Sequence, residues 1–179
     1  MYSAAETHST GARWYAVWTR SRQEKSTAAL LETLQVPHYL PLKSEARKWS
    51  DRKQSVMVPL FSGYLFVNIN AEGDSKLQVL KAPGVVGLVG NSSGPAPIPA
   101  EQVEQIRTVV NSGVEYSNCD YFEEGDRVRV IRGALTGVQG TLLYGKSQSR
   151  LNVSIDMIQH SLAVIVSRND LELLPTIKG

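Results

Sequence analysis

The stretch Pro59-Leu60-Phe61-Ser62-Gly63-Tyr64-Leu65-Phe66-Val67-Asn68-Ile69 decides the fold of the first half, because from Tyr64 onward it alternates as a central strand does. Leu65, Val67 and Ile69 share one face, which is typical of a hydrophobic core. Tyr64, Phe66 and Asn68 share the other face, and Phe61 precedes them before the Ser62-Gly63 turn. We expect this aromatic face to be covered either by a helix of the same chain or by a partner.

The residues before this stretch predict a strand and a helix. Residues 1–12 are small and polar without a period, so we expect a disordered leader. Trp14 to Trp18 is an apolar strand with aromatic residues on both faces. Ser21 followed by Glu24 has the spacing of a capping box, which predicts a helix from there to about Gln35.

The rest of the first half adds an extended segment, a hairpin and two more helices. Residues 36–42 are extended between prolines, and helices are expected over 75–81 and 101–110, with a short strand over 85–89 between them. The run from Lys43 to Lys53 holds five basic residues and Trp49. It has two interpretations, a solvated loop or a hairpin that follows a phosphate backbone.

A change of composition separates the two halves. Residues 114–121 are expected to be a linker between a first domain over 13–113 and a second domain over 122–179. The second domain predicts five short strands, at 127–131, 138–144, 151–155, 162–166 and 171–173. So short an open sheet would leave unpaired edges, so we expect a small closed β-barrel and an α+β protein overall.

Charge and composition limit the classes of function. The first 113 residues hold 12 Lys and Arg against 9 Asp and Glu, and the remaining residues hold 7 against 8, so neither half is strongly basic. Nucleic-acid contacts must therefore come from local patches. No apolar run approaches the roughly 20 residues that cross a bilayer, and a single cysteine excludes internal disulfides; we expect a cytoplasmic protein without membrane contacts.

The residues give little support to catalysis. His8, His38 and His160 are scattered, and none has a metal-ligand spacing with Cys119. No phosphate-binding glycine motif occurs. We therefore expect no enzyme activity, no metal and no cofactor.

Several motifs in order resemble the bacterial NusG family of transcription elongation factors over residues 13–175. The second half carries a KOW-like signature over 124–131, with Gly133, Gly137 and Gly140 after it. The first half is similar to the family's NGN domain through Trp14-Tyr15, Pro59 to Val67, Pro83-Gly84-Val85 and Pro97-Ile98-Pro99. The spacing of residues 18–25 and the Trp49 to Lys53 hairpin resemble the specialised paralogues of the RfaH and UpxY type most.

This resemblance implies a polymerase-binding surface. Family members bind the clamp helices of the RNA polymerase largest subunit, and the equivalent patch here comprises Trp18, Phe61, Tyr64, Phe66 and Ile106. A second polymerase contact would fall in the loop Ser75, Lys76, Leu77 and Gln78, which lacks the paralogue's His-Thr-Thr-Thr sequence. Trp14, Arg20 and Arg22 fall where such proteins touch the non-template DNA strand or nascent RNA, although Trp14 is equally explained as core.

The barrel departs from the housekeeping members at one loop. Met157-Ile158-Gln159-His160 replaces a segment implicated there in binding termination factor Rho, so Rho is not an expected partner. A small-subunit ribosomal protein is an expected partner through Met157, Ile158 and Val164, which are equally explained as barrel core. The resemblance implies a monomer.

Two functions follow. The first is an elongation and antitermination factor that promotes processive transcription of selected operons. The alternative is a stand-alone KOW-type module that binds RNA or the ribosome, which the net charge of −1 over residues 114–179 disfavours. Autoinhibition by a helical form of the barrel is not expected, because its sequence keeps a strand period.

Overall fold

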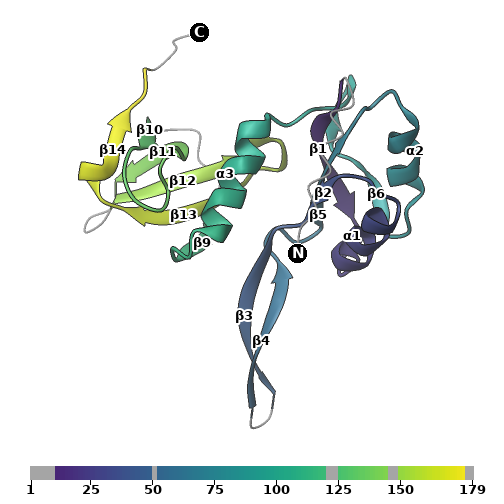
Figure 1. Ribbon diagram of the computed structural model, residues 1–179, viewed down its shortest axis with the longest axis horizontal. Coiled ribbons are helices and arrows are strands. Elements are labelled where there is room, and N and C mark those ends of the chain that lie inside the picture. The colour runs from purple at the N-terminus through teal and green to yellow at the C-terminus, as the bar shows by residue number, and fades with distance from the viewer. Residues whose placement is uncertain (1–10, 50–51, 120–124, 145–148, 176–179) are drawn as a thin grey trace. The chain divides into compact units, whose positions relative to one another are not determined.

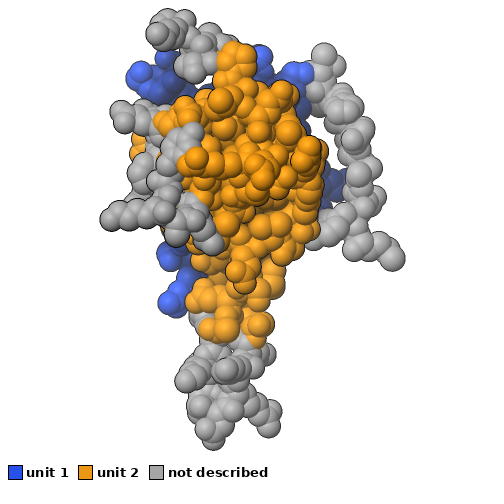
Figure 2. All heavy atoms as spheres, turned by 90° about the vertical axis from the view of Figure 1, so that its left-hand side faces the viewer, with its two compact units in different colours: residues 1–40, 59–98 blue, residues 41–58, 99–179 orange. Residues whose placement is uncertain are grey.

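A computed structural model of the chain describes residues 11–49, 52–119, 125–144 and 149–175. These residues form two compact units. The N-terminal unit is made of residues 1–40 and 59–98, and the C-terminal unit is made of residues 41–58 and 99–179 (Figure 2). The predicted leader lies almost entirely outside the described residues, as does the tip of the hairpin. No helix within the described ranges is long and apolar enough to cross a membrane.

The N-terminal unit is built on a four-stranded sheet in the order β2-β5-β1-β6 (Figure 1). Its elements are β1 (Arg13–Thr19), α1 (Glu24–Thr33), β2 (His38–Tyr39), β5 (Tyr64–Ile69), α2 (Asp74–Lys81), β6 (Val85–Leu88) and the small ribbon of β7 (Gly90–Asn91) and β8 (Gly94–Pro95). The strand that opened the sequence analysis, β5, is thus an inner strand, as its alternation predicted. It pairs antiparallel with β1, with Trp18 opposite Tyr64.

One face of this sheet forms the hydrophobic core of the unit. Leu65, Val67 and Ile69 are buried there, as predicted. Leu31 from α1 and Val79 from α2 pack into the same cluster, because each helix turns an apolar stripe toward the strands. The two helices predicted over these regions are confirmed, although α1 ends two residues before the predicted end.

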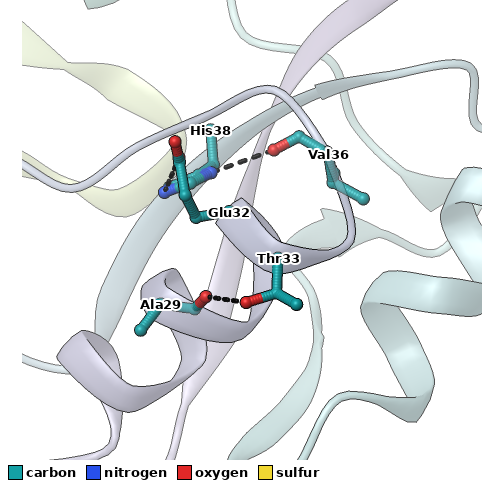
Figure 3. A network of polar contacts seen from close by, with 5 residues as sticks. All are labelled: Ala29, Glu32, Thr33, Val36 and His38. Atoms are coloured by element: carbon teal, nitrogen blue, oxygen red, sulfur yellow. Dashed lines mark hydrogen bonds and ion pairs between the residues drawn. The ribbon is translucent and has the colours of Figure 1, made fainter. Parts of the chain in front are cut away.

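A polar network closes the carboxyl end of α1 and leads into β2 (Figure 3). Gln35 takes a left-handed backbone conformation with φ of 54°, which turns the chain out of the helix. His38 then places Nδ1 at 2.9 Å from the Val36 carbonyl oxygen and Nε2 at 3.8 Å from a Glu32 carboxylate oxygen. His38 therefore shapes a turn and does not belong to a catalytic cluster.

The opposite face of the sheet corrects one sequence prediction. Phe61 and Phe66 were expected to be exposed to a partner, but they are 1% and 0% exposed. Their rings meet edge to face with centroids 6.2 Å apart, and Tyr39 from β2 stacks on Phe66 at 6.4 Å. Local alternation places these rings on a second face, but it cannot show that they pack against one another.

The C-terminal unit contains a six-stranded antiparallel sheet in the order β14-β10-β11-β12-β13-β9. Its elements are α3 (Ala100–Asn111), β9 (Tyr116–Cys119), β10 (Asp126–Val130), β11 (Gln139–Tyr144), β12 (Ser149–Ile155), β13 (His160–Val166) and β14 (Leu171–Leu173), with short 3₁₀ turns at Asp156–Ile158 and Arg168–Asp170. The five predicted strands are all present as β10 to β14, which confirms the α+β fold class. Leu151, Val153, Leu162 and Val164 lie in its core.

Part of the expected linker forms a strand. Residues 116–119 form β9, which pairs with β13 from Tyr116 opposite Val164 to Cys119 opposite Ser161. The helix α3 contacts β12, and Gln102 of α3 forms hydrogen bonds with Asp156. By their contacts, both elements group with the C-terminal unit. The domain bounds 13–113, 114–121 and 122–179 stay a prediction. The side chains of a polar, acidic stretch do not predict strand pairing of this kind, because the pairing uses backbone groups.

The basic run forms an antiparallel ribbon of its own. The strands β3 (Leu42–Trp49) and β4 (Arg52–Pro59) make a separate two-stranded sheet. The hairpin interpretation is therefore the correct one for the backbone.

Candidate binding site

Trp18 is the exposed aromatic residue of the N-terminal sheet. It lies on the inner strand β1, yet 52% of it remains exposed. Tyr64 of β5, which is half-buried, stands opposite it on one side, and Gly87 of β6 stands opposite on the other. A side chain at Gly87 would meet nothing within 4 Å, so the sheet is open beside the indole. The three positions lie side by side on β5, β1 and β6, and we call them the Trp18 surface.

A turn with two arginines follows the Trp18 surface directly. The register of β1 and β6 shifts between Trp18 and Thr19, which ends the regular strand there. Arg20 and Arg22 are exposed in the turn that leads to α1, and Arg22 has a left-handed backbone with φ of 65°. Such a conformation is uncommon outside glycine and costs energy, and strained residues of this kind cluster at functional sites. We call residues 20–22 the arginine turn.

The structure separates Trp14 from the arginines with which the sequence grouped it. Trp14 lies near the start of β1, so about 20 Å of chain separates it from Arg20 at roughly 3.3 Å per strand residue. Its carbonyl accepts a hydrogen bond from the Ile98 amide at 2.7 Å, and its side chain is half-buried. The explanation as a packed residue is therefore favoured, and Trp18 is the aromatic residue adjacent to the turn.

The five residues of the predicted polymerase patch differ in their accessibility. Trp18 is exposed and Tyr64 is half-buried, whereas Phe61, Phe66 and Ile106 are buried. Ile106 lies in α3 on the stripe formed with Val103 and Val109. The expectation that all five side chains are free for a partner is therefore wrong for three of them.

The second predicted polymerase contact lies on a helix and not in a loop. Residues 75–78 occupy the first half of α2. Leu77 and Gln78 are exposed, while Ser75 and Lys76 are half-buried. Leu77 is the apolar residue that this segment offers to solvent.

The barrel residues proposed for a ribosomal partner lie mainly in the core. Ile158 and Val164 are buried, and Met157 is half-buried in the 3₁₀ turn before β13. The sequence left core and contact as alternatives, and burial favours the core for Ile158 and Val164. His160 of the same segment contacts the Ile158 carbonyl oxygen through Nδ1.

One feature of the arrangement was invisible in the sequence. No local signal marks Gly87 as the neighbour of Trp18, because the strand pairing that joins them is a tertiary contact. In addition, the described residues contain no group of three His, Cys, Asp or Glu side chains that could hold a metal ion. The fold and the site thus define an α+β protein of two units, with an aromatic and basic surface at one end of an inner strand.

Comparison with known proteins places this class in a family. Residues 12–107 match the family model NusG, described as transcription termination factor nusG. The chain is similar to transcription termination/antitermination protein NusG of Thermus thermophilus, with 32% identity over 72% of this chain and 80% of that protein. It is also similar to the proteins of that name from Bacillus subtilis, at 30% identity over 79% and 88%, and Helicobacter pylori, at 21% over 89% and 97%.

The chain belongs to the NusG family of transcription factors. A solved structure supports the fold: a structure of Thermotoga maritima NusG, titled for its domain interaction, aligns with a TM-score of 0.51. That alignment covers 92% of this chain and 98% of the other at 21% identity. The fold and family predicted from the sequence are therefore confirmed.

Proposed function

We propose that this protein is a transcription elongation and antitermination factor that binds the clamp helices of RNA polymerase and promotes processive transcription of selected operons. Family membership gives the class of function. The observation that carries the proposal is the exposed Trp18 on an inner strand, because an apolar ring of this size in solvent is a typical site for a protein partner. A specialised role of the UpxY and RfaH type belongs to the same proposal and rests on the sequence spacing around Trp18 and the hairpin.

The proposed contact centres on the Trp18 surface. Trp18 and Tyr64 supply the accessible aromatic area, and Phe66, two residues after Tyr64 on the same face of β5, is buried against Phe61. Burying a large apolar side chain contributes about 1.5–3 kcal/mol. Trp and Tyr are also the residues that most often dominate binding energy. Ile106 is buried in this structure, so Trp18 and Tyr64 are the accessible residues of the predicted patch.

The arginine turn extends the proposed contact to nucleic acid. Arg20 and Arg22 are exposed next to an exposed indole, and cations beside a stacking ring suit a single strand such as the non-template DNA strand or nascent RNA. This pairing replaces the grouping with Trp14. Binding through the turn should weaken as salt rises, because arginines displace counterions from phosphates.

The proposal includes a second polymerase contact, a ribosomal partner and the oligomeric state. Exposed Leu77 and Gln78 on α2 are the accessible residues for a second polymerase contact. Half-buried Met157 is the accessible part of a site for a small-subunit ribosomal protein. We propose a monomer, without Rho as a partner.

A second candidate function concerns the C-terminal unit alone. Arg127 and Arg129 are both exposed on β10, which is the kind of local basic patch that a KOW-type RNA-binding module needs. Arg129 also lies 3.9 Å from a Glu172 carboxylate oxygen, which reduces its free charge. The double variant Arg127→Ala with Arg129→Ala would abolish tight, salt-sensitive RNA binding if this function were the main one.

The polymerase proposal is tested by binding and by transcription. Trp18→Ala should weaken binding to purified bacterial RNA polymerase by about 30-fold, which corresponds to about 2 kcal/mol. Gly87→Leu should weaken binding similarly by filling the open side of the surface. Reconstituted transcription over a terminator should show less read-through with either variant than with the wild type.

Ile165→Ala is the matched control, because Ile165 is another exposed apolar strand residue, in the C-terminal unit. It should bind and act as the wild type does. Equal polymerase binding by wild type and Trp18→Ala would remove the proposal.

A further inference from the structure

The first residue of α1 is a buried acid that does not cap its own helix. Glu24 is 3% exposed, and its Oε1 accepts a hydrogen bond from the Gly63 amide at 2.7 Å. The sequence predicted instead that Glu24 would close a capping box with Ser21, and no side-chain cap is present at this helix start. Burying a carboxylate is costly unless it is hydrogen-bonded. The bond to the Gly63 amide meets this requirement and directs the Glu24 carboxylate away from its own helix.

Gly63 binds both ends of the arginine turn. Its amide donates to Glu24, after the turn, and its carbonyl accepts from the Thr19 amide, before the turn, at 2.8 Å. One residue of the β4–β5 connection therefore closes the segment 19–24 into a loop. Gly63 itself has φ of 82°, a conformation that favours glycine.

A second connection holds the same segment from another element. The Arg20 amide donates to the Gly84 carbonyl at 2.7 Å, and Thr27 Oγ1 donates to the Pro83 carbonyl at 3.2 Å. Gly84 approaches α1 so closely that a Cβ there would lie 2.9 Å from Thr27 Oγ1. The arginine turn is thus fixed between two turns that are distant from it in sequence.

We propose that Glu24 is a positioning residue that clamps the arginine turn, so that Arg20 and Arg22 are held in a fixed place beside Trp18 before the partner binds. This inference rests on the proposed function, because it assigns a role in that same contact. The physical gain is preorganisation: a turn that is already fixed loses less conformational freedom on binding. The left-handed Arg22 persists because the surrounding hydrogen bonds determine its backbone.

The test compares two substitutions at one position in the full chain. Glu24→Ala removes the acceptor, and Glu24→Gln keeps a neutral oxygen at the same reach. We expect Glu24→Ala to weaken binding to a polymerase elongation complex with exposed non-template DNA about tenfold, as the loss of a hydrogen bond to a charged group does. Glu24→Gln should stay within about threefold of the wild type.

A structural readout accompanies the binding data. Hydrogen exchange of the Gly63 amide, followed by NMR, should accelerate about tenfold in Glu24→Ala and much less in Glu24→Gln. Glu32→Ala is the matched control, because Glu32 is an acid of the same helix with an 83% exposed side chain, and it should leave both readouts unchanged.

Glu24→Asp is a second variant for the case that Glu24→Ala does not fold. Its side chain keeps the carboxylate but is too short to span the same separation. It should also weaken binding. Wild-type affinity in Glu24→Ala or Glu24→Asp overturns the clamp, and so does equal weakening in Glu24→Gln and Glu24→Ala. If Trp18→Ala binds as the wild type, the proposed function fails and the clamp fails with it, whatever Arg20→Ala does. If those two lose binding and Glu24→Ala does not, only the clamp is wrong.

Discussion

The N-terminal and C-terminal units differ in that, among the described candidate residues, only the N-terminal unit leaves a large aromatic one exposed. In the N-terminal sheet, Trp18 stays half-exposed on an inner strand, beside a glycine that leaves space. In the C-terminal sheet, the candidate residues Ile158 and Val164 are buried. The difference teaches that an apolar residue chosen from sequence alternation belongs to a binding surface only where its neighbours leave it uncovered.

The largest expected effect would test the buried aromatic pair of the N-terminal sheet. Phe66→Ala should lower the free energy of unfolding by about 3–5 kcal/mol, because it removes a fully buried ring that packs on Phe61 and Tyr39. Urea unfolding followed by circular dichroism would measure it. A loss below about 1 kcal/mol, together with lost polymerase binding, would return Phe66 to the contact surface and break the comparison.

The next effect would test the C-terminal sheet. Ile158→Ala should cost about 2–4 kcal/mol of unfolding free energy, because its side chain is core. Ile165→Ala, at an exposed position of β13, should cost less than about 1 kcal/mol in the same assay. Similar costs for the two substitutions would show that Ile158 is not packed as the structure has it.

Two glycines, Gly84 in the turn before β6 and Gly87 within β6, differ in the space that a new Cβ would have. Gly84→Ala should cost about 1–3 kcal/mol, because Gly84 has φ of 90° and a new Cβ would lie 2.8 Å from Gln23 Cβ. Gly87→Ala should be nearly neutral, since its Cβ would meet nothing within 4 Å. Thermal melting of both variants measures the difference, and equal melting temperatures would argue against the close approach of residues 83–84 to α1.

The smallest effect concerns the docking of α3 on the C-terminal sheet. Gln102 donates through Nε2 to Asp156 Oδ2 at 2.6 Å and accepts from the Asp156 amide at 3.2 Å. Gln102→Ala should cost about 1 kcal/mol, since the contact is exposed to water. Gln105→Ala, three positions along the same helix, serves as the control in urea unfolding. No difference between the two variants would mean that these hydrogen bonds do not hold α3.

The sequence was a reliable guide to local periodicity and to the family. The two-residue alternation from Tyr64 to Ile69 was sufficient to predict β5 and its core face, because the side-chain period of a strand is local. The same held for the three helices and for β10 to β14. The order of motifs identified the NusG family, which the family model and the relatives confirm.

Only tertiary structure decided which residues are covered and which contacts a polar group makes. Phe61 and Phe66 are buried and contact each other edge to face, β9 joins a sheet through backbone pairing, and Glu24 bonds to Gly63 across 39 positions of sequence. Trp18 remains uncovered because its cross-strand neighbour happens to be Gly87. Periodicity reports the direction of a side chain from its own strand, whereas burial and hydrogen bonding depend on segments that only folding brings together.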